Sequence, residues 1–391
     1  MTFVTLDNKD WCKGIYHQGR LHFDGIPDTA TKTWKSVTYL RDKNVSYASL
    51  YVDGKTLDDV CPELLKGEWL AQKARLKAFH NSFVEAKIDL NQNCFFDLVP
   101  EQFLLELCET KTKIIDSVFE NYQKPDNYEL LFGTEQIIND ISNRKLNIDL
   151  EPLRNNLHDN RARVLLNTIR KSTGRVEYNL FGTKTGRLAT MPGSFPIMNL
   201  DSAYKGVLKP TNDLFVELDF NAAEIRTLIG LNGEKQPEGD IHEWNAKRLG
   251  ISREQAKREV FSWMYGSGKV DGSRYEKLFG LNKLLERFYD GFIIRNYYNR
   301  ILRSDQFHSI NYLIQSTSND LVLDQLIKIN KLLKNKKSFI SFMIHDSVVI
   351  DLHKEDRELV NKIIKIFSET SLGKFPVNIS AGKDYGSLRK I

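Results

Sequence analysis

Two aspartates stand at the ends of segments that the sequence predicts as buried strands. Asp219 closes the run FVELD, and Asp346 lies in the turn HDS between SFMI and VVIDL. A carboxylate at such a place is costly unless it is paired, hydrogen-bonded or bound to a metal. Taken singly, each could simply cap a turn or a helix, because Asp is common there. Together they could hold two Mg²⁺ ions, which favour few carboxylates, several waters and phosphate oxygens, and which activate one oxygen while stabilising the leaving one.

A second group of residues recurs at intervals of four. Arg253, Lys257, Phe261 and Tyr265 lie in REQAKREVFSWMYG, which ends in Gly266. In a helix, residues four apart stay on one slowly winding face. That face is cationic at its N-terminal end and aromatic at its C-terminal end. Cations and the helix N-terminus can bind phosphates, and aromatic rings can stack on a base or sugar. Alternatively, the two rings could pack into the core while the two cations are solvated. That interpretation is reasonable for any one of these residues, but it explains the whole stripe poorly.

The composition of the 391 residues is that of a globular protein with room for two or three domains. Hydrophobic residues make up 41% and charged residues 27%, and the net charge of +5 allows nucleic acid as a partner without demanding it. The four cysteines show no metal-ligand spacing, which predicts reduced thiols. The chain begins without a signal-peptide pattern and has no long apolar run. We therefore expect a cytoplasmic protein without a membrane span.

The elements that must position these residues follow from hydrophobic periodicity. Within residues 1–60, GRLHF, SVTYL and YASLYV are predicted as strands. Later strands are predicted for FVELDF, for both arms of SFISFMIHDSVVIDL, and for PVNIS. Helices are predicted over 64–88, 100–122, parts of 128–170, 242–266, 274–290, 304–335 and 355–371.

Several motifs, taken in order, resemble those of the family A DNA polymerases, which are Klenow-like enzymes and phage replicases. TKTGRL resembles the family's TxTGRL, LDFNAAEIR its motif A, RxxxKxxxFxxxYG its motif B, and IHD its motif C. GDIH precedes motif B, NYLIQSTSND lies between motifs B and C, and GKDYG follows. The resemblance covers roughly residues 95–391, and motif B alone fixes five residue types in fourteen positions.

The resemblance implies an α+β fold of the right-hand type, with an antiparallel palm sheet and helical fingers and thumb. It places an abbreviated thumb at 86–175, the palm at 176–228 and 310–391, and the fingers at 229–309. Residues 1–85 would form a small β-rich domain that is able to recruit a processivity or replisome partner. The partners implied are primer–template DNA and dNTPs, and the chain is expected to be a monomer.

The resemblance also assigns roles to single residues. Asp219, Asp346 and Lys257 would be catalytic, and the two aspartates with the backbone carbonyl of Phe220 would hold two Mg²⁺ ions, for which Mn²⁺ can substitute. Glu224 would fill the space that a ribose 2′-OH needs, so that the product is DNA. The nucleotide-binding set would be His242, Arg253, Lys257, Phe261, Tyr265, Glu224 and Phe220. The DNA-binding set would be Thr185, Arg187, Asn311, Gln315 and His345.

One departure from the family's pattern leaves two alternatives open. Ser347 stands where the family usually has the Glu of HDE, and HDS is the form found in single-subunit RNA polymerases. Glu224 and Phe261 favour DNA synthesis, since those RNA polymerases lack the Glu and usually carry Met at the second position. The other alternative is a non-catalytic DNA-binding relative. No D-x-E pair occurs in residues 1–85, which predicts that proofreading is absent. A role in phage replication, hence in the host cytoplasm, fits the short chain best.

Overall fold

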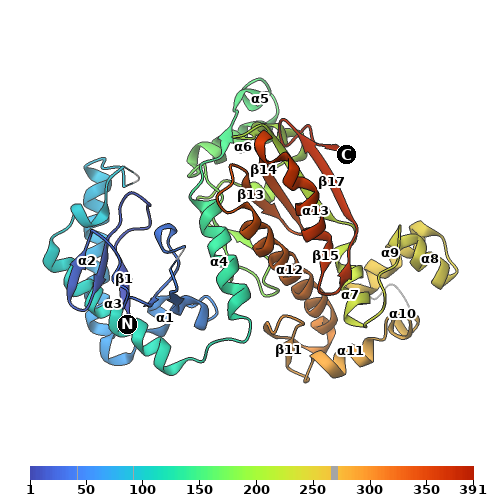
Figure 1. Ribbon diagram of the computed structural model, residues 1–391, viewed down its shortest axis with the longest axis horizontal. Coiled ribbons are helices and arrows are strands. Elements are labelled where there is room, and N and C mark those ends of the chain that lie inside the picture. The colour runs from blue at the N-terminus through green and yellow to red at the C-terminus, as the bar shows by residue number, and fades with distance from the viewer. Residues whose placement is uncertain (42, 91, 266–271) are drawn as a thin grey trace. The chain divides into compact units, whose positions relative to one another are not determined.

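The computed structural model describes residues 1–391 apart from 42, 91 and 266–271, so Gly266 of motif B lies outside the described residues. The chain divides into two compact units, Met1–Asn143 and Arg144–Ile391 (Figure 1). The first unit therefore extends well beyond the predicted small domain of residues 1–85. Within the described part of the chain, no helix has the length and apolar character needed to cross a membrane.

The first unit packs a small sheet and short turns against helices. Its helices are α1 (Leu57–Val60), α2 (Glu63–Glu85), α3 (Glu101–Asn121) and α4 (Tyr128–Ser142). Its strands are β1 (Phe3–Thr5), β2 (Ile15–His17) and β3 (Arg20–His22), which form an antiparallel sheet, and the parallel pair β4 (Lys32–Thr33) and β5 (Ser46–Tyr47). Its 3₁₀ helices are Thr38–Leu40, Ala48–Tyr51 and Phe95–Asp97.

Three predictions for this unit are wrong. SVTYL and most of YASLYV form the 3₁₀ helices Thr38–Leu40 and Ala48–Tyr51 rather than strands. Strand propensity was overridden because helical turns bury Leu40 and Leu50 completely in the core. The cysteines are not all reduced: Cys12 and Cys94 form a disulfide with their Cα atoms 5.7 Å apart, while Cys61 and Cys108 are free and buried. Spacing could not reveal this pair, because 82 positions separate its members.

The two units differ in charge. Residues 1–143 hold 16 Lys and Arg against 22 Asp and Glu, a net charge of −6, whereas residues 144–391 hold 40 against 29, a net charge of +11. Helix α3 buries its apolar stripe in the first unit and exposes Glu101, Glu109 and Glu120. Exposed carboxylates repel phosphates. The assignment of residues 86–175 to a thumb, in which helix 100–122 would cross the duplex backbone, stays a prediction.

A five-stranded antiparallel sheet forms the centre of the second unit, in the order β13-β14-β10-β17-β18. On β10 (Leu214–Phe220), Val216 and Leu218 face the helix α13 (Val360–Ser368), whereas Glu217 and Asp219 alternate onto the opposite face. Helix α12 (Gln306–Leu333) and helix α13 pack on this sheet (Figure 1). The strands are β10 (Leu214–Phe220), β13 (Phe339–Ile344), β14 (Ser347–Leu352), β17 (Val377–Gly382) and β18 (Arg389–Lys390).

Most helices of the second unit follow the predicted ranges, but two ranges are interrupted. The predicted helix 355–371 is α-helical only over Val360–Ser368, after a 3₁₀ helix (Lys354–Leu359) and before the strand Glu369–Thr370. The range 242–266 is two helices, α8 and α9, because Gly250 ends the first in the left-handed conformation (φ 66°) and Ser252 caps the next. Gly280 (φ 61°) divides the range 274–290 in the same way. The helices are α5 (Glu151–Arg154), α6 (Asn160–Lys171), α7 (Ala223–Leu231), α8 (Ile241–Leu249), α9 (Arg253–Met264), α10 (Gly272–Phe279), α11 (Leu281–Phe288), α12 (Gln306–Leu333) and α13 (Val360–Ser368).

Short strand pairs and 3₁₀ turns join these elements. The pairs are β6 (Asn147–Ile148) with β9 (Leu208–Lys209), β7 (Tyr178–Asn179) with β8 (Ala189–Thr190), β11 (Ile293–Arg295) with β12 (Ile301–Arg303), and β15 (Glu369–Thr370) with β16 (Gly373–Lys374). The 3₁₀ helices are Ile197–Asn199, Ser202–Val207 and Lys354–Leu359.

Candidate active site

The two predicted metal-binding aspartates lie at one end of the central sheet. Asp219 on β10 is paired in register with Ser347 on β14 and with Asn378 on β17, and Asp346 directly precedes Ser347 in the β13–β14 turn. Burial and the nearby charge of Asp346 raise the pKa of Asp219 to about 6, although Asn378 Nδ2 donates a hydrogen bond of 3.2 Å to its carboxylate. Within the described residues, neither aspartate has an ion-pair partner. The strand ends therefore carry two carboxylates that repel each other.

The turn between β13 and β14 also explains the local role of Ser347. His345 occupies the left-handed region (φ 54°) and is exposed, so that the chain reverses within two residues. Ser347 Oγ donates to the carbonyl of Ile344 across 3.1 Å, and the side chain of Ser347 is buried. A serine at this position thus helps to close the hairpin.

Glu224 connects three segments that are distant in sequence. It lies in the first turn of α7, five residues after Asp219, and its side chain is 12% exposed. Arg187 Nη2 donates to Glu224 Oε1 across 2.6 Å, and the Tyr265 hydroxyl donates to Oε2 across 2.5 Å. Burial, followed by this hydrogen bond, raises the pKa of Tyr265. The TKTGRL loop, motif A and the end of motif B therefore meet at one carboxylate.

The predicted nucleotide stripe runs along α9 and continues onto α8. The rings of Phe261 and Tyr265 stack with centroids 6.2 Å apart, and His242 of α8 lies 6.0 Å from Phe261. Burial lowers the pKa of His242. Its Nδ1 is buried and has no hydrogen-bond partner among the described residues. Lys257 is exposed one turn beyond Arg253.

Arg253 already has acidic partners in this structure. Its Nη2 lies 2.6 Å from Asp240 Oδ2, and its Nη1 lies 2.6 Å from Glu254 Oε1. Asp240 also caps α8 by accepting hydrogen bonds from the backbone N–H groups of His242 and Glu243. An incoming phosphate would therefore compete with a carboxylate for Arg253. Sequence reasoning missed Asp240, although its place before a predicted helix was a signal for a cap.

The predicted DNA-binding residues lie on two neighbouring segments and at the β13–β14 turn. Thr185 and Arg187 belong to the loop between β7 and β8, and Asn311 and Gln315 belong to α12. Thr185 is buried, whereas Asn311 and Gln315 are half-buried. The loop and helix are adjacent, since Lys184 Nζ lies 5.9 Å from the centre of the Tyr312 ring. His345 at the turn has no described contact with the other four.

A groove of about 550 Å³ opens beside this loop and the first turns of α12. It is lined by aromatic and cationic side chains, among them Lys184, Phe292, Arg303, His308 and Tyr312. Asp305 also lines it, paired with His308. Cations and stacking rings together are the surface that single-stranded nucleic acid requires. Sequence reasoning did not single out this groove, which joins Lys184 of the loop to residues between 292 and 312.

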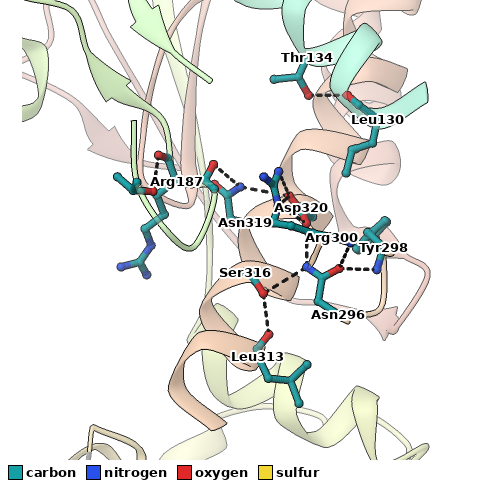
Figure 2. A network of polar contacts seen from close by, with 12 residues as sticks. Leu130, Thr134, Arg187, Asn296, Tyr298, Arg300, Leu313, Ser316, Asn319 and Asp320 are labelled. Atoms are coloured by element: carbon teal, nitrogen blue, oxygen red, sulfur yellow. Dashed lines mark hydrogen bonds and ion pairs between the residues drawn. The ribbon is translucent and has the colours of Figure 1, made fainter. Parts of the chain in front are cut away.

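A buried polar network that the sequence did not reveal holds the same loop in place. It joins Arg300 and Asp320 to Asn296, Ser316 and Asn319, and it reaches the backbone of the TKTGRL loop (Figure 2). Asp320 ends the quoted motif NYLIQSTSND, but Arg300 and Asn296 lie in a Tyr-rich and Arg-rich connection with no evident chemical pattern.

Comparison with known proteins agrees with the motifs. No family model matches the chain. DNA polymerase I of Caldicellulosiruptor bescii is 25% identical over 260 residues, which cover 51% of this chain and 30% of that protein. The DNA polymerase of Mycobacterium phage L5 is 24% identical over 204 residues, which cover 44% of this chain and 33% of that protein. DNA polymerase I of Borreliella burgdorferi is 28% identical over 160 residues, which cover 37% of this chain and 17% of that protein. The chain thus spans about a third or less of the length of these relatives.

The fold is that of a polymerase domain. The POL domain of Pol1 from M. smegmatis, solved in complex with DNA primer–template and dNTP, superposes with a TM-score of 0.63 at 11% identity, covering 92% of this chain and 87% of that one. The α+β right-hand fold is therefore confirmed. The curated relatives confirm the resemblance to family A DNA polymerases.

Proposed function

We propose that this chain is a template-directed DNA polymerase that extends a primer with dNTPs. The observation that carries the proposal is the position of Glu224, whose carboxylate accepts hydrogen bonds from Arg187 and from Tyr265. It brings the predicted primer contact and the predicted nucleotide stripe together, five residues from Asp219. The names of the curated relatives support the same activity.

The two strand-end carboxylates suit a hard divalent cation. Asp219 is partly desolvated and repelled by Asp346, so a cation would stabilise both ionised forms. In the described residues, no group of three or more His, Cys, Asp and Glu side chains is arranged to bind a metal. Mg²⁺ keeps several waters and takes further ligands from substrate phosphates, so it needs few protein carboxylates. Asp219, Asp346 and the carbonyl of Phe220 would hold two Mg²⁺ or Mn²⁺ ions, which would activate the primer hydroxyl and stabilise the leaving pyrophosphate.

The residues of α9 bind and orient the nucleotide in this proposal. Lys257 is exposed and free to meet a phosphate, whereas Arg253 must exchange Asp240 for the triphosphate. Both partners of Arg253 are carboxylates at a partly exposed site, where an ion pair is worth little and is readily exchanged. Phe261 and Tyr265 then offer stacked rings to the sugar and base.

Glu224 gives this site its preference for the sugar of dNTPs. Its bulk lies beside Tyr265, where a ribose 2′-OH would need space. Ser347 does not by itself favour RNA synthesis, because its hydroxyl is engaged within the hairpin turn. The finer parts of the proposal are that the chain does not proofread, that it acts in phage replication as a monomer, and that residues 1–85 recruit a replisome protein. The phage L5 relative supports the replication role.

Primer extension by the purified chain tests this function. Wild type should extend a primer on a defined template in the presence of Mg²⁺. Asp346→Asn should abolish extension, because it removes a carboxylate that would hold the metal ions. Primer–template binding should stay within about threefold of wild type, since asparagine removes one charge but still forms hydrogen bonds. Undiminished extension by Asp346→Asn would show that this carboxylate holds no essential metal.

A further inference from the structure

Arg300 and Asp320 form a buried ion pair next to the TKTGRL loop. The guanidinium contacts the carboxylate side-on, with Nη2 2.7 Å from Oδ1 and Nε 2.9 Å from Oδ2. The Arg300 side chain is 9% exposed, and that of Asp320 is 0% exposed. Burying two charges costs desolvation energy, so such a pair contributes little net stability compared with apolar packing. A role in positioning would explain its presence better than a role in stability.

The β11–β12 hairpin presents Arg300 to the helix α12 by means of Asn296. The side-chain oxygen of Asn296 accepts hydrogen bonds from the backbone N–H groups of Tyr298 and Arg300, both at 2.9 Å. Its Nδ2 donates to Asp320 Oδ2 at 2.8 Å. Asn299 turns the chain in the left-handed region (φ 62°). The hairpin loop is therefore fixed to α12 by Asn296, a residue that is itself only 2% exposed.

The same guanidinium lies against the backbone of Gly186. A Cβ at this position would overlap Arg300, with only 2.7 Å to its Nε, and Gly186 also has a positive φ of +78°. Asn319, the neighbour of Asp320, donates from Nδ2 to the Gly186 carbonyl across 2.9 Å. The loop is thus held between Arg300 and Asn319. Arg187 follows immediately, and its guanidinium points away from the network (Figure 2), toward Glu224.

We propose that Arg300 and Asp320 are positioning residues that set the place of Arg187 at the primer end. The proposal rests on the polymerase function proposed above. Asp320 orients the Arg300 guanidinium, the guanidinium fixes Gly186, and Gly186 fixes the backbone from which Arg187 reaches Glu224. Neither member of the pair need touch DNA or nucleotide. A shift of about 1 Å in a positioning group can cost a rate factor on the order of 10².

Arg300→Lys is the test variant, since lysine keeps the charge but cannot make the side-on contact. Arg295→Lys is the matched control, because Arg295 is exposed on the same hairpin. Single-turnover extension should be roughly tenfold slower in Arg300→Lys, with the dissociation constant for primer–template within about twofold of wild type. The control should stay within about twofold of wild type in both measurements.

A double-mutant cycle with Arg187→Ala distinguishes positioning from general damage. If Arg300 acts through Arg187, then Arg300→Lys should slow extension by less than about twofold once Arg187 is alanine. An equal, roughly tenfold loss in both backgrounds would overturn the proposal. Should Arg300→Lys fail to fold, Gly186→Ala enters the same cycle, because its Cβ would overlap the Arg300 guanidinium and so disturb the contact that holds the loop. Failure of wild type to extend any primer would instead refute the polymerase function itself.

Discussion

Replacing Glu224 by alanine and by glutamine separates the effect of its bulk from that of its charge. Alanine removes a side chain that is only 12% exposed and opens space beside Tyr265. Steric rejection of one added hydroxyl provides discrimination of up to roughly 10²-fold. Glu224→Ala should therefore lower the preference for a dNTP over the matching rNTP by about that factor.

The same substitution should also impair DNA synthesis. Alanine leaves Arg187 without its carboxylate partner and Tyr265 without its acceptor. Hydrogen bonds to charged groups are worth about 1.5–3 kcal/mol each. Loss of one such contact in the transition state corresponds to roughly a 10- to 150-fold fall in kcat/KM for dNTPs. Glutamine keeps the bulk and one acceptor oxygen, so its sugar preference should stay within about threefold of wild type.

Single-nucleotide insertion is measured as kcat/KM for a dNTP and for its matching rNTP. The ratio of the two values gives the sugar preference, and the dNTP value gives the loss of DNA synthesis. The assay uses wild type, Glu224→Ala and Glu224→Gln on one primer–template. An unchanged sugar preference in Glu224→Ala would refute the steric role. Equal loss of preference in the glutamine variant would show that charge, rather than bulk, selects the sugar.

Three further predictions concern Asp219 and Arg253. The pKa of Asp219 is raised to about 6, so Mn²⁺ affinity measured by calorimetry should fall as the pH drops below about 6. An affinity that stays constant from pH 8 to pH 5 would contradict the assignment of Asp219 as a metal ligand. The pKa of Asp219 in the folded protein also lies above its ordinary value of 3.8, so between about pH 4 and pH 6 the folded state binds more protons than the unfolded state. The contribution of Asp219 to the free energy of unfolding therefore falls as the pH rises through this range. Asp219→Asn should therefore raise the Tm of the metal-free protein at pH 8 but not near pH 4; no gain at pH 8 would count against burial of this charge. Arg253→Ala should raise the KM for dNTPs by about tenfold or more with little change in DNA affinity, and an effect confined to DNA binding would contradict its phosphate role.

The strands that carry the two aspartates could be predicted because apolar runs and a tight turn are local signals. FVELDF and the arms of SFISFMIHDSVVIDL form β10, β13 and β14, and their antiparallel pairing brings Asp219 beside the turn of Asp346. The four-residue spacing of motif B likewise predicted α9. In each case the information lies within a few neighbouring residues.

The remaining features depend on contacts between distant segments. Gly250 and Gly280 each divide a range that the sequence predicted as one helix. The prediction missed these breaks because hydrophobic periodicity continues across a left-handed residue. The Cys12–Cys94 pair, the ion pair of Asp240 with Arg253, and the contact of Arg300 with Gly186 join positions 13 to 114 residues apart. No single-sequence pattern reports such distances. The sequence therefore predicted the groups that could carry the chemistry, but not the side chains that orient them.

Template-directed insertion by the purified chain tests the central claim most directly. Each dNTP and each rNTP is offered singly, with Mg²⁺, to four primer–templates that differ only in the first unpaired template base. The proposed function predicts that only the complementary dNTP is added efficiently to each primer, and that omission of Mg²⁺ or the Asp346→Asn substitution abolishes the addition. Insertion independent of the template base, equal use of rNTPs, or no insertion with any nucleotide would contradict it.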